Sequence, residues 1–99
     1  MNSAIGSKFD MHDWTLVSVT VDWESSTVVV ETRSPNADIV KVSLHGVTLV
    51  SIPKREEWGP SVSINKVDGP IHQFGSVKLA IEMQSGDTIF LEGKSIDML

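Results

Sequence analysis

The sequence predicts an all-β domain of about seven short, mainly antiparallel strands that form a sandwich or a small barrel. Apolar and polar residues alternate in short runs, which is typical of strands that bury one face. Turn-forming residues separate these runs at intervals of about 8 to 12 residues. No stretch of ten or more residues follows the period of 3.6 that a helix requires.

Two runs in the first third of the chain, 15–23 and 27–33, predict a hairpin joined by a short polar connection. Four apolar residues of the first run share one parity and are expected to face the core: Val17, Val19, Val21 and Trp23. Leu16 falls on the opposite face. On this pattern Trp23 is a core residue.

The third and fourth predicted strands follow a turn at 34–38, which holds three strong turn formers. The third strand, 39–45, alternates regularly. Gly46 marks a bulge or a bend before the fourth strand, 47–52, where the alternation blurs and Pro53 ends the run. That strand is therefore expected to be buried on both sides, or to be covered by the segment that follows it.

The segment 54–61 is the least strand-like part of the chain and divides four runs from three. A fifth strand is predicted over 62–67, and Asp68-Gly69-Pro70 predicts a turn. Residues 71–75 are irregular.

The last part of the chain predicts a second hairpin. Residues 76–83 show the cleanest alternation, and 84–87 form a glycine-containing loop that leads to a strand over 88–92. Gly93 predicts a bulge, and 95–99 is expected to trail off. Short connections favour a meander, in which each strand pairs with the next.

The 99 residues predict one domain, 11–99, after a loosely ordered segment 1–10. The chain has no cysteine, its beginning lacks the pattern of a secretory signal, and no apolar run approaches the roughly 18 residues of a membrane span. We therefore expect a cytoplasmic protein without membrane contact.

The net charge of −5 comes from eight basic and thirteen acidic residues. The basic residues are scattered, and the adjacent pair Lys54-Arg55 is followed at once by two glutamates, so no nucleic-acid surface is expected. An acidic surface favours solubility and would steer a basic partner toward it.

No residue pattern predicts catalysis or a cofactor. The serines lie in no Gly-x-Ser-x-Gly elbow, and the glycines form no phosphate-binding loop. The available metal ligands have no supporting spacing: His12, Asp13, Asp22, Glu24, His45 and His72. We therefore predict a protein that is not an enzyme and holds no cofactor or metal.

Three tryptophans stand out in a chain without tyrosine. Trp58 lies in the dividing segment beside Glu56 and Glu57, and Trp14 lies on the parity opposite to Trp23. Because tryptophan is enriched in binding hot spots, these four residues are the predicted partner-binding residues: Trp14, Glu56, Glu57 and Trp58.

Four short motifs give the chain a family resemblance: His12-Asp13-Trp14, Asp22-Trp23, Trp58-Gly59-Pro60-Ser61 and Met83-Gln84-Ser85-Gly86-Asp87. With them, residues 12–96 resemble small uncharacterised bacterial β-domains, some of which are similar to immunity proteins of polymorphic toxin systems. The resemblance implies a non-enzymatic cytoplasmic protein that binds and neutralises a toxin domain. It identifies no interface residues.

Three functional hypotheses follow. The first is a non-enzymatic protein-binding module, immunity-like, with a basic protein as partner. The second is a self-associating domain, in which an edge strand or the apolar residues Val29, Val50 and Ile52 pair between copies. The third is a small-ligand or carbohydrate binder, with tryptophan faces that line a cleft at one end of the fold.

Overall fold

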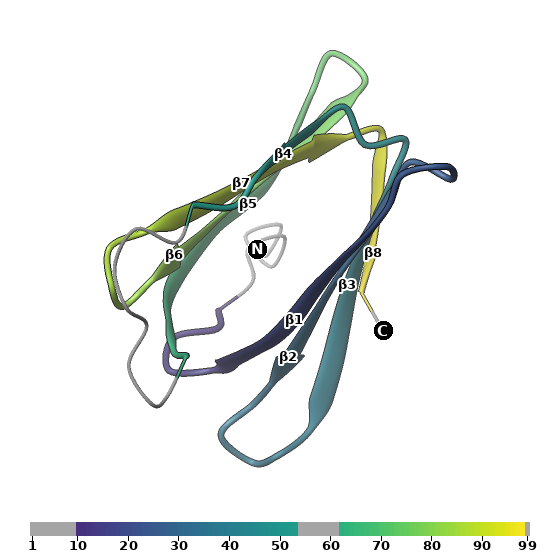
Figure 1. Cartoon of the computed structure of the whole chain (residues 1–99). Helices are drawn as coiled ribbons and strands as arrows, with labels where there is room; N and C mark the ends of the chain where they lie inside the picture. The colour runs from purple at the N-terminus through teal and green to yellow at the C-terminus, as the bar shows by residue number, and fades with distance from the viewer. Residues whose placement is uncertain (1–9, 54–61, 99) are drawn as a thin grey trace, which may run out of the picture.

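The structure, a computed structural model, describes residues 10–53 and 62–98, which form eight strands and no helix. The strands make two antiparallel sheets that face each other as a sandwich (Figure 1). Sheet A has the order β1 (Thr15–Asp22), β2 (Thr27–Arg33), β3 (Ile39–His45), β8 (Ser95–Met98). Sheet B has the order β4 (Leu49–Ser51), β7 (Thr88–Gly93), β6 (Ser76–Met83), β5 (Ile64–Gln73). The all-β prediction is confirmed, with eight strands in place of seven.

The core fills the space between the sheets. Alternate residues of each strand point inward, as the period of two requires. The largest fully buried side chains come from both sheets: Val28, Val30, Thr32, Val42, Leu44, Ile64, Val77, Met83, Ile89 and Leu91. Each buried Val, Leu or Ile stabilises the fold by about 1.5 to 3 kcal/mol relative to an exposed one. The buried hydroxyl of Thr32 donates a hydrogen bond to the carbonyl oxygen of Val40 at 2.9 Å.

The strand pairing is a meander only in part. Strands β1 to β3 and β5 to β7 are consecutive hairpins, as predicted, but β4 pairs with β7 and β8 pairs with β3. The segment 95–99, expected to trail off, therefore contains a sheet strand, Ser95–Met98. Four residues are too few to show a clear period in the sequence.

A bent ribbon joins the two sheets along one side, because β3 leads into β4 while β7 leads into β8 beside it. Two glycines allow the bend. Gly46 has φ +62, and a Cβ on Gly93 would lie 2.9 Å from the carbonyl oxygen of His45. The bend predicted at Gly46 is present.

The residues before β1 join the sheets on the other side. The Asp13 amide donates to the carbonyl of Ile64, the Ile64 amide donates to the carbonyl of Trp14, and Leu16 donates to Val62, at 2.8 to 2.9 Å. Trp14 is half-buried and packs against the core. The segment thus connects the edge of sheet A to the start of β5.

A β-bulge in β1 reverses the predicted parity of its first residues. The register with β2 shifts between Leu16 and Ser18. Leu16 is consequently buried, with 4% of its surface exposed, while Val17 is 43% exposed. The prediction that Leu16 lies opposite the core face was wrong.

Trp23 was wrongly predicted as a core residue. The strand β1 ends at Asp22, and Trp23 begins the turn to β2 with 88% of its surface exposed. A turn breaks the alternation, so parity along the strand says nothing about Trp23.

The predicted turn at Asp68-Gly69-Pro70 and the predicted irregular segment 71–75 were also wrong. Residues Ile64–Gln73 form the longest described strand, β5, which contains a cis Gly69–Pro70 peptide and a register shift between Asp68 and Ile71. The actual turn falls at Phe74 and Gly75, both with positive φ. Gly69 and Pro70 mark a bulge within the strand, which is the other structure that such residues allow.

The expectations for 1–9 and for the dividing segment 54–61 concern residues outside the described part of the chain.

Candidate functional site

The turn between β1 and β2 places Trp23 at one end of the sandwich. The Asp22 carboxylate accepts a hydrogen bond from the Ser25 amide at 3.2 Å, and the Ser26 amide donates to the carbonyl of Trp23 at 3.3 Å. Ser26 has φ +56, and its carbonyl accepts from the Val47 amide at 2.9 Å. These bonds fix the turn and tie it to the connection between β3 and β4.

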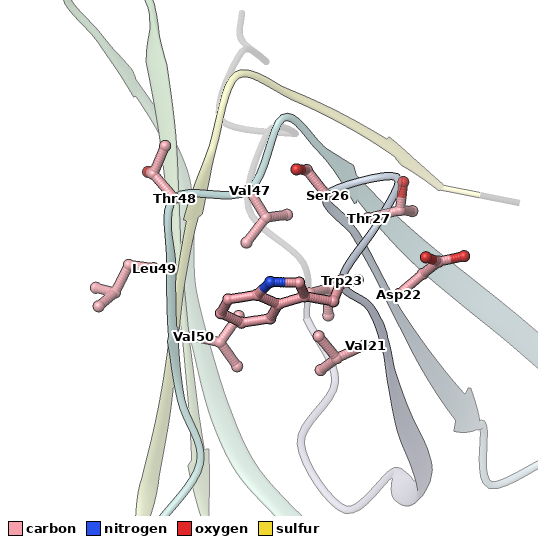
Figure 2. A pocket seen from close by; sticks show the side chains of 10 residues that line it. Val21, Asp22, Trp23, Ser26, Thr27, Val47, Thr48, Leu49 and Val50 are labelled. Atoms are coloured by element: carbon pink, nitrogen blue, oxygen red, sulfur yellow. The ribbon is translucent and has the colours of Figure 1, made fainter.

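A hollow of about 470 Å³ lies beside this turn. Ten residues from both sheets line it: Val21, Asp22, Trp23, Ser26, Thr27, Val28, Val47, Thr48, Leu49 and Val50. Figure 2 shows the side chains of Val21, Val47 and Val50 gathered around the indole of Trp23. The hollow therefore has an apolar floor and one large aromatic wall.

The residues around the hollow expose an unusual amount of apolar surface. Trp23 is 88% exposed and Val21 is 42% exposed. The side chain of Leu49, on the same rim, points away from the indole (Figure 2). We call Trp23 and Val21, with the hollow beside them, the Trp23 surface. Clustered exposed apolar groups rimmed by polar ones are typical of binding sites.

The polar rim of the hollow holds one acidic side chain, Asp22, and hydroxyl groups that are largely engaged within the protein. Asp22 and Glu24 are exposed on either side of Trp23. The Thr27 hydroxyl donates to the carbonyl of Ser25 at 3.3 Å and accepts from the Ser25 hydroxyl at 3.1 Å. The Thr48 hydroxyl donates to the carbonyl of Glu92 at 3.5 Å. The rim thus offers negative charge more than free hydroxyl groups.

A polar cluster surrounds a second hollow, of about 400 Å³, where the segment before β1 meets sheet B. The Gln84 amide donates to Asp13 Oδ1 at 2.6 Å, and the Asn65 amide donates to Glu82 Oε2 at 2.7 Å. His12 Nδ1 lies 2.7 Å from the carbonyl oxygen of Asn65. A carbonyl only accepts, so this Nδ1 carries the hydrogen.

The contacts of this polar cluster give it a structural role. His12 Nε2 lies 3.5 Å from Asp13 Oδ2, and both side chains are about 60% exposed. The same residues flank the backbone hydrogen bonds that hold the segment before β1 to β5. The side-chain bonds reinforce that attachment.

The candidate metal ligands do not converge. Within 10–53 and 62–98, no group of three or more His, Cys, Asp or Glu side chains could hold a metal ion. Two histidines instead lie beside single carboxylates: His12 beside Asp13, and His45 Nε2 at 3.1 Å from Asp97 Oδ2, across β3 and β8. His72 is exposed on β5.

The predicted partner-binding residues are only partly described. Trp58, Glu56 and Glu57 lie outside the described residues, and Trp14 packs partly against the core. Sequence reasoning missed Trp23 as a surface residue. The signal was its setting, because an aromatic residue between Asp22 and Glu24, before two serines, is typical of a turn.

In three comparisons with known proteins, no family model, no curated protein and no solved structure matches this chain. The described residues form no helix that is long and apolar enough to cross a membrane. The functional proposal therefore rests on the fold and the site.

Proposed function

We propose that the protein is a non-enzymatic protein-binding module whose contact surface is the Trp23 surface. The 88% exposure of Trp23 is the observation that supports this most. Burial of an aromatic side chain of this size contributes strongly to binding, and tryptophan is enriched among the residues that dominate interface energies. The hydrogen-bonded turn fixes the backbone of Trp23, which lowers the entropy cost of binding.

The openness of the site favours a protein over a small molecule. A small-ligand pocket typically buries 70 to 90% or more of its ligand. Here Trp23, the largest side chain that lines the hollow, is itself almost fully exposed to solvent. A protruding indole beside a shallow apolar hollow instead fits a partner that receives Trp23 and inserts a side chain next to it.

The charge of the site favours a basic partner. Asp22 and Glu24 flank Trp23, and the whole chain has a net charge of −5. A lysine or arginine of the partner would meet the Asp22 carboxylate at the rim and the face of the indole, where a cation is also attracted. The resemblance to immunity proteins supplies one specific case, in which the partner is a toxin domain.

Affinity capture from lysate of the native cell tests this proposal. We expect tagged wild-type protein to recover one basic protein that Trp23→Ala does not recover. Phe74→Ala is the matched control, because Phe74 is also an aromatic turn residue, 96% exposed, at the β5–β6 hairpin. Recovery of the same protein by all three forms would contradict the proposal.

The volume of the hollow supports a second candidate, a small-ligand or carbohydrate site. About 470 Å³ lies within the roughly 300 to 1,000 Å³ of known ligand pockets. A ligand at 100 times its dissociation constant adds about 2.7 kcal/mol to stability. A thermal-shift screen of sugars and metabolites measures this, and a shift abolished by Trp23→Ala would favour the second candidate.

A further inference from the structure

We propose that the free edge of β1 pairs with β1 of a second copy of the chain, antiparallel about a twofold axis at Thr20. The pairing would join two A sheets into one continuous sheet. It involves Ser18–Asp22 and so shares Val21 and Asp22 with the lining of the hollow beside Trp23, but it does not use Trp23 itself.

The outer edge of β1 is unpaired in the described structure over most of its length. Thr15 bridges to Ser63, and the Leu16 amide donates to Val62. Beyond the bulge, none of the described strands other than β2 pairs with Ser18–Asp22. An unpaired edge presents a row of amide and carbonyl groups to which another strand can bond.

The other three edges of the two sheets each have a feature that hinders pairing. Strand β4 has three residues and β8 has four. Strand β5 is long, but Pro70 interrupts it, Lys66 is exposed on it, and two register shifts bend it. Proline, lysine and bulges are the usual protection of an edge. Beyond its bulge, β1 has neither proline nor lysine.

The sequence of β1 is complementary to itself about Thr20. In that register Thr20 faces Thr20 of the second copy, Val19 faces Val21, and Ser18 faces Asp22. Cross-strand Thr–Thr pairs and pairs of β-branched residues are favourable in antiparallel sheets. No two like charges face each other, although each copy has a net charge of −5. The contact thus avoids the repulsion that other faces of an acidic protein would meet.

Two inward-facing valines also favour this contact. Val19 and Val21 pair with the buried residues Val30 and Val28 and so face the same side of sheet A. Val19 is nevertheless only half-buried, and Val21 is 42% exposed. A neighbouring strand would cover both.

The contact is small, so we expect a weak dimer. A stable interface usually buries more than about 1,000 Å², and one pair of five-residue strands provides less. The mass measured by light scattering should therefore rise from 10.8 kDa toward twice that value as the concentration approaches about 1 mM.

Charge substitution at the twofold position tests the pairing. Thr20→Lys and Thr20→Glu each place like charges opposite each other, so each variant alone should stay at 10.8 kDa. An equimolar mixture of the two should regain the rise in mass, since lysine then faces glutamate. Ser43→Lys is the matched control, because Ser43 lies in the same cross-strand row on β3, away from the edge, and should dimerise like wild type.

Three results would overturn the proposal: a wild-type mass that stays constant over this range, a dimer that Thr20→Lys leaves intact, or a mixture that remains monomeric. The thermal unfolding transition of each variant serves as the control that a variant which stays monomeric is still folded. Neither Thr20 variant removes Trp23, and Trp23→Ala leaves Ser18–Asp22 unchanged, so either proposal can fail while the other holds.

Discussion

Trp14 and Trp23 occupy opposite environments, although they lie only nine positions apart. Trp14 packs against the core where the two sheets meet, and Trp23 projects from a turn. Truncation of Trp14 to alanine removes packed apolar surface, whereas truncation of Trp23 removes almost none.

We therefore expect Trp14→Ala to lower the free energy of unfolding by about 2 kcal/mol, below the 3 to 5 kcal/mol of a fully buried tryptophan. Trp23→Ala should change it by less than about 0.5 kcal/mol. Urea denaturation measures both. An equal loss of unfolding free energy in the two variants would contradict the packing of Trp14 against the core and the exposure of Trp23.

At the residue scale the sequence predicts most of the core and misses where the alternation breaks. In β2, β3 and β6 one of the two alternating faces is buried, as the regular alternation of these runs predicts. Leu16 and Trp23 are not placed correctly, because a bulge and a turn interrupt β1. A bulge inserts a residue without any required residue type, so parity counted across it is reversed.

At the scale of the element, β5 depends on a glycine in the middle of the strand. Gly69 has φ +108, and a Cβ there would lie 2.7 Å from the carbonyl oxygen of Lys78 on β6. Because that oxygen belongs to the neighbouring backbone, it has little freedom to move away. Gly69 thus meets two separate constraints, one of backbone conformation and one of space.

Gly69→Ala should lower the free energy of unfolding by about 2 to 4 kcal/mol, as the sum of strain and overlap. Gly86→Ala is the matched control, because Gly86 has φ +102 and a Cβ there would meet no heavy atom within 4 Å. Gly86→Ala should cost about 1 kcal/mol, from strain alone. Chemical denaturation of both variants separates the two contributions, and an equal loss would show that the overlap at Gly69 costs nothing.

The sequence predicts six of the described strands approximately, but it does not predict β8 or the continuity of β5. The β8 strand alternates polar and apolar residues, but it has only four residues, which is too short a run to be a clear signal. The Gly69-Pro70 sequence is compatible with a turn and with a bulge inside a strand, and the pairing of β5 with β6 shows that it forms a bulge.

At the scale of the whole molecule, the bent ribbon and the shared core connect the two sheets. Strands β3 and β8 lie in one sheet while their continuations β4 and β7 lie in the other. If one sheet unfolded, the apolar inner face of the other sheet would be exposed to water. The sandwich should therefore unfold as one cooperative unit.

Far-ultraviolet circular dichroism and tryptophan fluorescence should give coincident urea transitions with one midpoint. Circular dichroism reports strands of both sheets, and the fluorescence of a variant with Trp23→Phe and Trp58→Phe reports Trp14 at their junction. Two separated midpoints would mean that the sheets unfold independently.

Calorimetric titration of the purified captured partner measures how strongly Trp23 contributes to partner binding. We expect Trp23→Ala to weaken binding by about 30-fold or more, which corresponds to the roughly 2 kcal/mol of a hot-spot residue, and Phe74→Ala to bind like wild type. An unchanged dissociation constant for Trp23→Ala would contradict this contribution and place the contact surface elsewhere on the molecule.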